Sequence, residues 1–487
     1  MTRDSVAALV PSFNRSIHIE ARAERLTSEA GAIVVREVLD KLGIVPWLVE
    51  RLADPRRPDL ITHPLAELLR TAVILRALGW RDQDDADTLR DDPAFRLAVS
   101  ERRGGAALAT RTKDGAPLPK NPAVPDGLAS QPTLSRTDRV LSIDANRTVL
   151  RESLLELAAR RVRAEHGGHR QRYATLDIDS IPIEVHGEQP GAEWNGHYHA
   201  RVYHPILATL DGGDILDLRL RKGSAHTAEG ALDFIAPLLD RVEQKVCQVA
   251  AVRIDAGFPE EGLLWNLETR GTPYVARIKN NPVLDRMAVP HLTRPVGRPP
   301  AEPRTWFHEM SYAAKSWSRE RRVVLVLQER PGELLLHHFW LLTSWRTTQM
   351  PAEALLELYR RRGAAEGGFG ELMDVLDPAL SSALRPKTHY RGKSPATVYP
   401  SGDAFAINET RLLLDALAFN VMHAARTLVE AATGEGWSLR RLRERLLRAA
   451  ARFLVHSRRV TMVLVCSAAR AWSHLWPKLA RVQVADG

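Results

Sequence analysis

The chain has 487 residues, of which 44% are hydrophobic and 26% are charged, a composition typical of a globular protein with two or three domains. Lys and Arg number 68 against 59 Asp and Glu, and this formal net charge of +9 favours a polyanionic partner. The two cysteines are too few for a disulfide framework or a cysteine-rich zinc site. The first residues lack a continuous apolar core and no run approaches ~18 apolar residues, so we expect an intracellular protein without a signal peptide or membrane span.

Residues 1–165 have the pattern of a helical domain. Apolar residues recur at three- and four-residue spacing over 27–100, and residues 145–166 predict a basic amphipathic helix. Between these segments, residues 101–127 are rich in Gly, Pro and charge, which predicts a disordered insert.

The region 166–285 has the pattern of an α/β domain. Residues 173–185 alternate and are rich in β-branched side chains, which predicts a strand that carries Asp177 and Asp179. A hairpin follows and turns through Asp211-Gly212-Gly213. A hairpin followed by alternating helices and strands indicates a sheet with an antiparallel edge. The later elements are predicted as helix 227–243, strand 249–255, helix 259–271 and strand 272–279.

The rest of the chain divides into three further regions. Residues 286–350 predict a mainly β insertion with two strands around Pro331-Gly332. Helical patterns over 351–432 predict the second part of the α/β domain. The region 433–487 is predicted to be helical, and its segment 438–454 places Arg on one side and Leu on the other. This Arg-rich helix could bind a phosphate backbone or pack in a dimer.

Residues 355–373 predict one helix with a polar face. Tyr359, Arg362, Glu366 and residue 373 fall within a sector of roughly 60° at the helical period. Upstream, Asp179 lies on a predicted strand and Asp255 ends another, where ligands of open α/β sheets bind. Three such carboxylates suit Mg²⁺, and a pair of these ions supports phosphodiester cleavage. Asp residues are common at strand ends, so their spacing alone does not establish a metal site.

Five segments occur in order along the chain: LDIDSIPIEVHG, GAEWNGHYHARVYHPILA, RKGSAHTAEGALDFI, VRIDAGF and YRRRGAAE. Three N-terminal segments precede them: TSEAGAIVVREV, GWRDQDDADTLRDDP and LASQPTLSR. The five segments resemble bacterial insertion-sequence DDE transposases, in the IS-four-like branch with a Tyr-x2-Arg-x3-Glu-x6-Lys signature. The N-terminal segments resemble the same subgroup, and the likeness covers roughly residues 25–430.

This resemblance implies a ribonuclease-H-like catalytic domain with the β insertion between the second Asp and the Glu. It implies two Mg²⁺ ions (or Mn²⁺) per active site, with Asp179, Asp255 and Glu366 as catalytic metal ligands. Asp177 is the alternative first ligand, because it lies on the same strand face.

DNA contacts are also implied by the resemblance. Tyr359 and Arg362 would contact phosphate near the scissile bond, and Asn195 and His197 would line the DNA groove. Trp340, or Trp345 near it, would hold a flipped base by stacking, which is worth ~1–3 kcal/mol. For each tryptophan, packing within the sheet is the alternative.

The implied activity is transposition: the N-terminal domain binds terminal inverted repeats, and the enzyme cuts the element ends and joins them to target DNA. A homodimer would pair the ends in the bacterial cytoplasm, at the nucleoid, with no small-molecule cofactor. Two features depart from the signature. The first is Met373, which stands where the signature has Lys; Lys387 or Lys393 could replace the lost charge. The second is the Gly367–Gly370 run, in which each mid-helix glycine costs ~1 kcal/mol relative to Ala. These departures leave open a catalytically inactive or repurposed DNA-binding relative.

Overall fold

The structure is a computed structural model. It describes residues 11–19, 24–81, 83–108, 128–211, 213–294, 296–297, 301–381, 403–456 and 459–482. Most of the predicted insert at 101–127 lies outside these residues, as do Lys387 and Lys393.

Helices build the first part of the chain, as the apolar periodicity predicted. The most buried of them is α3, which ends at Gly79, whose φ of 88° places it in the left-handed region that glycine adopts without strain. Two short 3₁₀ segments lie at Pro58–Leu60 and Gly104–Leu108. The helices are α1 (Ala32–Leu42), α2 (Ile44–Arg51), α3 (Leu65–Leu78), α4 (Asp85–Thr88), α5 (Pro93–Val99), α6 (Gln131–Leu141) and α7 (Asp144–Glu165).

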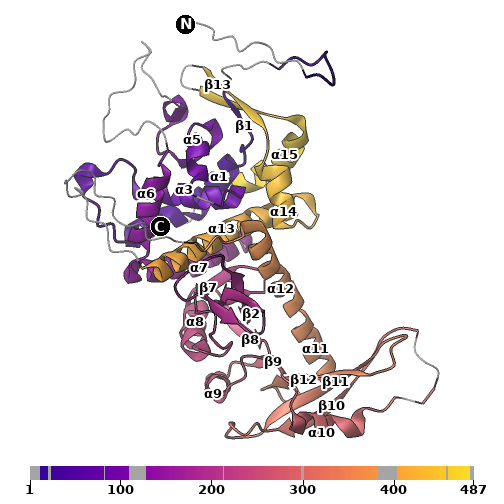
Figure 1. The fold of residues 1–487 in the computed structure, drawn as a ribbon. Helices are drawn as coiled ribbons and strands as arrows, with labels where there is room; N and C mark the ends of the chain where they lie inside the picture. Colours follow the sequence, from indigo (N-terminus) through magenta and orange to yellow (C-terminus); the bar gives the residue numbers. More distant parts are fainter. Residues whose placement is uncertain are drawn as a thin grey trace.

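A long helix from the other end of the chain completes this helical part. Figure 1 shows α13 (Ala404–Thr433) lying between the N-terminal helices and the sheet, and it contacts α1, α3, α6, α7 and the strand β7 (Ile215–Arg219). By length and composition α13 could cross a membrane, but 83% of its most apolar window is buried inside the protein. Such burial is the property of a core helix.

The main sheet has eight strands in the order β10-β11-β12-β9-β8-β2-β6-β7. The strand β2 (Tyr173–Ser180) is antiparallel to β6 (Ile206–Leu210) on one side and parallel to β8 (Gln248–Ile254) on the other. β6 pairs antiparallel with β7, and β8 pairs parallel with β9 (Tyr274–Ile278). In chain order the strands β2, β6, β7, β8 and β9 are therefore arranged 3-2-1-4-5. This is the ribonuclease-H-like mixed sheet that was predicted.

The β insertion continues this sheet. β12 (His337–Thr343) pairs antiparallel with β9, and β11 (Arg321–Glu329) and β10 (Arg304–Tyr312) follow outward (Figure 1). Two of the three strands were predicted, and β10 was not. The predicted insertion is therefore a lateral extension of the main sheet rather than a separate unit.

Helices cover both faces of the sheet. α7, α8 (Ala231–Lys245) and α9 (Glu261–Arg270) pack on one face, and α11 (Ala352–Arg360) packs on the other. The alternation is clear in β11, where Val323 and Leu325 face the first group and Val324 and Val326 face α11. A short helix, α10 (Pro282–Ala288), follows β9, and a 3₁₀ segment, Val289–His291, follows α10.

The C-terminal region differs from the helix predicted at 438–454. α14 (Leu439–Leu442) and a π-helix, Arg443–Leu447, give way to the strand β13 (Ala451–His456), which pairs with β14 (Arg459–Leu464) and with β1 (Leu26–Thr27). In β13, Ala451 and Phe453 are buried and their neighbours Arg452 and Leu454 are exposed. This period-2 pattern favours a strand, so the prediction of a helix through residue 454 was wrong. The chain returns to helix in α15 (Cys466–Arg481).

One apolar core joins the N-terminal helices, α13 and the C-terminal elements. It contains side chains from α1, α3 and α13 together with Trp437, Leu446 and Leu475. The domain boundaries proposed after residues 165, 285, 350 and 432 stay predictions, but the first and last of these regions share this core.

Candidate active site

Two parallel strands bring Asp179 and Asp255 side by side. In the register of β2 and β8, Asp177 lies opposite Arg253 and Ile178 lies opposite Ile254. Asp179 and Asp255 are the next positions along the two strands. Asp255 begins a tight loop in which the Phe258 amide donates to the Asp255 carbonyl oxygen, and the side chain of Phe258 is fully buried.

Glu366 approaches from a helical segment that is less regular than predicted. α11 ends at Arg360, α12 (Arg362–Glu371) begins after one residue, and a π-helix occupies Leu372–Leu376. The single helix predicted at 355–373 is therefore three consecutive segments. Because of this change, Met373 packs against the apolar core of the helical part instead of continuing the polar face.

Arg362 connects the three predicted carboxylates. Its Nη2 lies 2.6 Å from Asp179 Oδ2, its Nη1 pairs with Glu366 Oε1, and the same Nη1 lies 3.9 Å from Asp255 Oδ1. The Arg362 side chain is 7% exposed, against 14% for Asp179, 44% for Asp255 and 56% for Glu366. The three carboxylates thus converge on one buried guanidinium with two of them facing the solvent.

Burial dominates the electrostatics of this group. It raises the pKa of Asp179 to about 6; Arg362 opposes this shift, and the negative charges of Asp255 and Glu366 add to it. Burial also raises the pKa of the Tyr359 hydroxyl. For Arg362, burial acts to lower the pKa, but the surrounding carboxylates outweigh it and the pKa is raised. Arg362 therefore stays a cation among acidic groups.

The alternative first ligand, Asp177, has another role in the structure. It is fully buried and forms a two-pronged pair with Arg253, with Nε–Oδ1 and Nη2–Oδ2 distances of 2.7 and 2.6 Å. The remaining Arg253 Nη1 donates to the Leu358 carbonyl oxygen at 3.1 Å. This pair ties β2 and β8 to the end of α11, directly before Tyr359. Asp177 is therefore engaged in this buried pair, whereas Asp179 lies with Asp255 and Glu366 around Arg362.

A cleft of about 440 Å³ opens beside Asp255. Asn195 and His197 both line it, as does Lys279 at the end of β9. Asn195 donates to the Gly223 carbonyl oxygen at 2.8 Å and accepts from the His197 amide at 3.0 Å. The cleft thus places both predicted groove residues next to one of the carboxylates. It lies against a small sheet of β3 (Ile183–Glu184), β4 (Glu193–Asn195) and β5 (Ala200–Tyr203).

Tyr198 also lines this cleft and was not singled out from the sequence. Burial raises the pKa of its hydroxyl, and the charges of Asp179 and Asp255 add to the shift. Its ring packs edge-on against His204 at a centroid distance of 5.7 Å. The signal was present in the segment WNGHYH, where Tyr198 lies between two histidines.

His204 gives the cleft a buried hydrogen-bond acceptor. It is 3% exposed, its Nδ1 lies 2.9 Å from the Ala225 carbonyl oxygen, and its Nε2 has no partner among the described residues. The Nδ1 contact requires a proton there, so Nε2 carries a lone pair. Arg221 fixes the same loop by donating to the carbonyl oxygens of His204 and Thr227.

The tryptophan predictions need correction. Trp340 is 0% exposed and lies in the core beneath the sheet, so it presents no face for a base; the packing alternative holds. Trp345 packs partly buried beside α11. Trp194 was overlooked, although it is 64% exposed and lines the cleft. The segment around it was among the five that carry the family resemblance.

The arginines of the C-terminal Arg-rich segment are largely engaged within the protein. Arg443 donates to the carbonyl oxygens of Arg76 and Ala77 at the end of α3 and also to that of Val375, and burial lowers its pKa to about 10. Arg448 donates to the Leu78 carbonyl oxygen. These residues cap α3, which is a structural role that sequence alone did not distinguish from DNA or dimer contacts.

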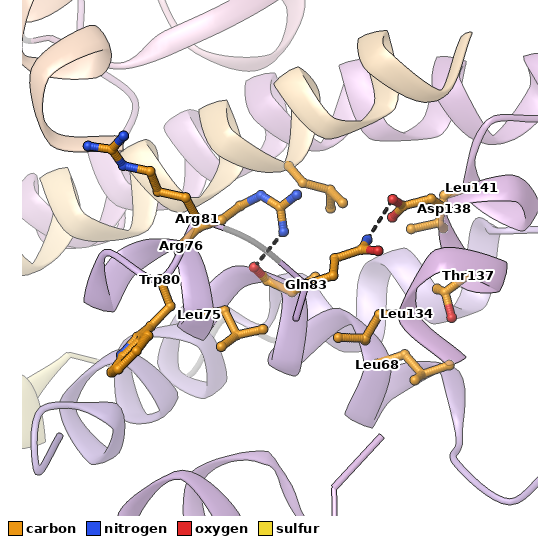
Figure 2. A pocket seen from close by; sticks show the side chains of 12 residues that line it. Leu68, Leu75, Arg76, Trp80, Arg81, Gln83, Leu134, Thr137, Asp138 and Leu141 are labelled. Carbon is orange, nitrogen blue, oxygen red and sulfur yellow. Dashed lines mark hydrogen bonds between the residues drawn. The ribbon is translucent and has the colours of Figure 1, made fainter. Parts of the chain in front are cut away.

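Other cavities lie away from the carboxylates. Figure 2 shows one between α3 and α6, where Gln83 donates to Asp138 at 2.6 Å; its volume of about 10 Å³ admits at most one water molecule. A larger groove of about 720 Å³ is lined by Ile181, Phe369 and Met373. Met373 therefore lies at this groove and against the apolar core of the helical part.

The carboxylates match a divalent metal in chemistry but not in their present arrangement. Oxygen donors of this kind are those that Mg²⁺ prefers. Among the residues that the structure describes, however, no three His, Cys, Asp or Glu side chains form a group that could hold a metal ion. The guanidinium of Arg362 lies between Asp179, Asp255 and Glu366.

Comparison with known proteins gives one family. No curated protein matches the chain. A cryo-EM structure of the piggyBac transposase synaptic complex with hairpin DNA is similar at 13% identity, covering 92% of this chain and 81% of that chain with a TM-score of 0.36, a likeness too distant to carry a conclusion. The family described as "Transposase DDE domain group 1" matches residues 9–372, which include all three carboxylates and more than half of the chain. The chain belongs to this transposase DDE domain family.

Proposed function

We propose that the protein is an active, metal-dependent transposase that binds the terminal inverted repeats of an insertion sequence, cleaves DNA at the element ends and joins these ends to target DNA. The convergence of Asp179, Asp255 and Glu366 on one buried cation, in a chain of the transposase DDE domain family, carries this proposal. It would act in the bacterial cytoplasm, at the nucleoid.

Each part of the site has a role in this proposal. Asp179, Asp255 and Glu366 would hold two Mg²⁺ ions, or Mn²⁺, and such a pair would supply activation of water and stabilisation of the leaving oxygen. Tyr359 and Arg362 orient the phosphate, because a guanidinium donates two parallel hydrogen bonds to such a group. No small-molecule cofactor is required.

The cleft supplies further DNA contacts. Asn195 and His197 line it beside Asp255, and Lys279 adds a positive charge at its rim. A protein with an excess of basic residues attracts the phosphate backbone as a whole. In this proposal the helical N-terminal part binds the inverted repeats. Two protomers pair the two element ends, so light scattering of the protein bound to DNA should give the mass of a homodimer.

The rival function is that of a DNA-binding transposase relative without catalysis. Two observations favour it: Met373 supplies no charge at the signature position, and the carboxylates are not arranged as a ready metal site among the described residues. It predicts specific binding of the flanking DNA without any cleavage.

A cleavage assay separates the two functions. The purified protein is incubated with Mg²⁺ and a duplex that spans the boundary of the inverted repeat flanking the gene. We expect nicking at that boundary for the wild type and none for Asp255→Asn or Glu366→Gln. Glu357→Gln is the matched control, because Glu357 is an exposed carboxylate of the adjoining helix and pairs only with Arg360 among the contacts described.

The outcomes are distinct. DNA that is bound but uncut by the wild type would establish the rival function. Cutting of arbitrary duplexes would replace transposition with general nuclease activity, and cutting that survives Asp255→Asn or Glu366→Gln would overturn the site assignment.

A further inference from the structure

The position of Arg362 has a consequence for how a metal reaches the carboxylates. Its two terminal nitrogens contact Asp179 and Glu366, and Nη1 lies 3.9 Å from Asp255. A cation placed there neutralises the repulsion among three neighbouring carboxylates, as a divalent ion would. The guanidinium and a metal ion bound by the same carboxylate oxygens would therefore compete for the space between the three carboxylates.

The guanidinium is not fully satisfied in this position. Its Nε is buried and has no hydrogen-bond partner among the described residues. A buried donor without a partner costs about 1–3 kcal/mol. A phosphate group would offer Arg362 both charge and well-placed acceptors.

The helix that carries Arg362 and Glu366 is anchored at its far end by Phe369 and Glu371, but its glycines face open space. A side chain added at Gly363, Gly367, Gly368 or Gly370 would meet no atom within 4 Å, so packing does not require these glycines. Each lowers the stability of a helix by ~1 kcal/mol relative to Ala. α12 also lies between the break at Arg361 and the π-helix at Leu372–Leu376, a kind of interruption found often at functional sites.

We propose that Arg362 is an internal counter-ion that closes the carboxylate site to metal until DNA draws the guanidinium onto a phosphate. DNA binding and metal binding are then positively coupled, and by thermodynamic linkage each strengthens the other equally. The inference rests on the proposed function, because it assigns the three carboxylates to metal.

The test measures Mn²⁺ affinity from the free-ion electron paramagnetic resonance signal, with no need for turnover. The wild type is titrated alone and with a duplex from the DNA flanking the gene, and Mn²⁺ bound by the duplex alone is subtracted. We expect the duplex to tighten Mn²⁺ binding by about 5- to 150-fold, the usual range for coupled sites. Arg362→Gln should bind Mn²⁺ without DNA about as tightly as the wild type does with DNA.

A matched control separates this mechanism from a general effect of charge. Arg360 is exposed on the adjoining helix α11 and pairs with Glu357, and Arg360→Gln removes one positive charge without opening the space between the carboxylates. It should leave DNA-free Mn²⁺ affinity within a few-fold of the wild type. Arg362→Lys keeps the charge but not the fork geometry, so it should give an intermediate affinity even if Arg362→Gln folds poorly.

Three outcomes would overturn the inference. If Mn²⁺ binds equally with and without DNA, and Asp255→Asn abolishes it, the metal site stands and the counter-ion role fails. If Arg360→Gln and Arg362→Gln tighten Mn²⁺ binding equally, the effect is one of net charge and the counter-ion role fails. If no variant binds Mn²⁺ even with DNA, both the counter-ion role and the metal-dependent function fail.

Discussion

Asp179 lies near the end of β2, where the strand is only partly buried, and its surroundings shift its pKa strongly. Its pKa of about 6 in the folded protein is above the ordinary value of 3.8. A group whose folded pKa is raised binds its proton more tightly in the folded state, so its ionisation lowers stability as the pH rises between these two values. Asn at this position cannot ionise and escapes that loss.

The variant Asp179→Asn should therefore be more stable than the wild type at neutral pH in the absence of metal. We expect a gain of about 1–3 kcal/mol in the free energy of unfolding, which disappears below pH ~4 where both proteins are uncharged at this position. Urea unfolding in EDTA across this pH range measures the difference. A variant that is less stable at every pH would show that the ion pair with Arg362 outweighs the cost of burial.

Burial also raises the pKa of Asp177, two residues earlier, but we expect the opposite effect of its substitution. Arg362 keeps Glu366 as a partner when Asp179 is replaced, whereas the contacts described give Arg253 no carboxylate other than Asp177. Asp177→Asn leaves the buried guanidinium of Arg253 without its charged partner, and breaking a buried pair costs about 3–5 kcal/mol. Chemical unfolding should show this loss at neutral pH. The control is Asp374→Asn, which removes an exposed carboxylate paired with Arg440 and should change stability by less than ~1 kcal/mol. Equal effects of the two substitutions would contradict the proposed role of the buried pair.

Among the elements, α12 combines catalytic side chains with a weak helix. Gly367→Ala and Gly368→Ala add a methyl group that meets nothing within 4 Å, so each should raise stability by ~1 kcal/mol. Gly257→Ala is the contrasting substitution, because its Cβ would lie 2.6 Å from the Cβ of Thr227 and should destabilise the loop after Asp255. Thermal unfolding of the three variants measures both effects; destabilisation by Gly367→Ala would mean that α12 needs its glycine there.

Sequence patterns predicted which strands and helices carry the site residues, but they did not predict how those elements pack against one another. Strand alternation placed Asp179, and the short apolar run placed Asp255 at a strand end, but either Asp177 or Asp179 satisfied the pattern. The buried pair with Arg253 separates them, and it depends on the register between β2 and β8. Helical periodicity placed Glu366 on one face with Tyr359 and Arg362, and resemblance to a family signature then implied that it is the third metal ligand.

The missed elements have local causes. β13 follows directly on an Arg/Leu helical pattern, and its own alternation covers only six residues. Trp340 lies in a strand whose sequence allows its side chain on either face of the sheet. The pairing of β12 with β9 decides which face lies against the core. Arg362 was expected on a DNA phosphate; without DNA it lies among the carboxylates, a placement that depends on tertiary structure.

At the scale of the whole molecule, the two ends of the chain stabilise each other. β1 pairs with β13, and Trp437, Leu446 and Leu475 share a core with α1 and α3. A chain that ends at Gly434 would expose this apolar surface, and each large core side chain lost costs roughly 2–5 kcal/mol. We expect the truncated protein to lose its cooperative thermal transition, as followed by circular dichroism. An unchanged transition would contradict a shared core.

The central claim is that Asp179, Asp255 and Glu366 form one metal-binding catalytic centre, which Arg362 vacates for DNA. Its most direct test is a crystal structure of the protein bound to a duplex and Mn²⁺, with the ions located by anomalous scattering. We predict anomalous peaks within coordination distance of Asp179, Asp255 and Glu366, with the guanidinium of Arg362 on a phosphate. Mn²⁺ located elsewhere, or Arg362 still bridging Asp179 and Glu366 in the presence of DNA and metal, would contradict the claim.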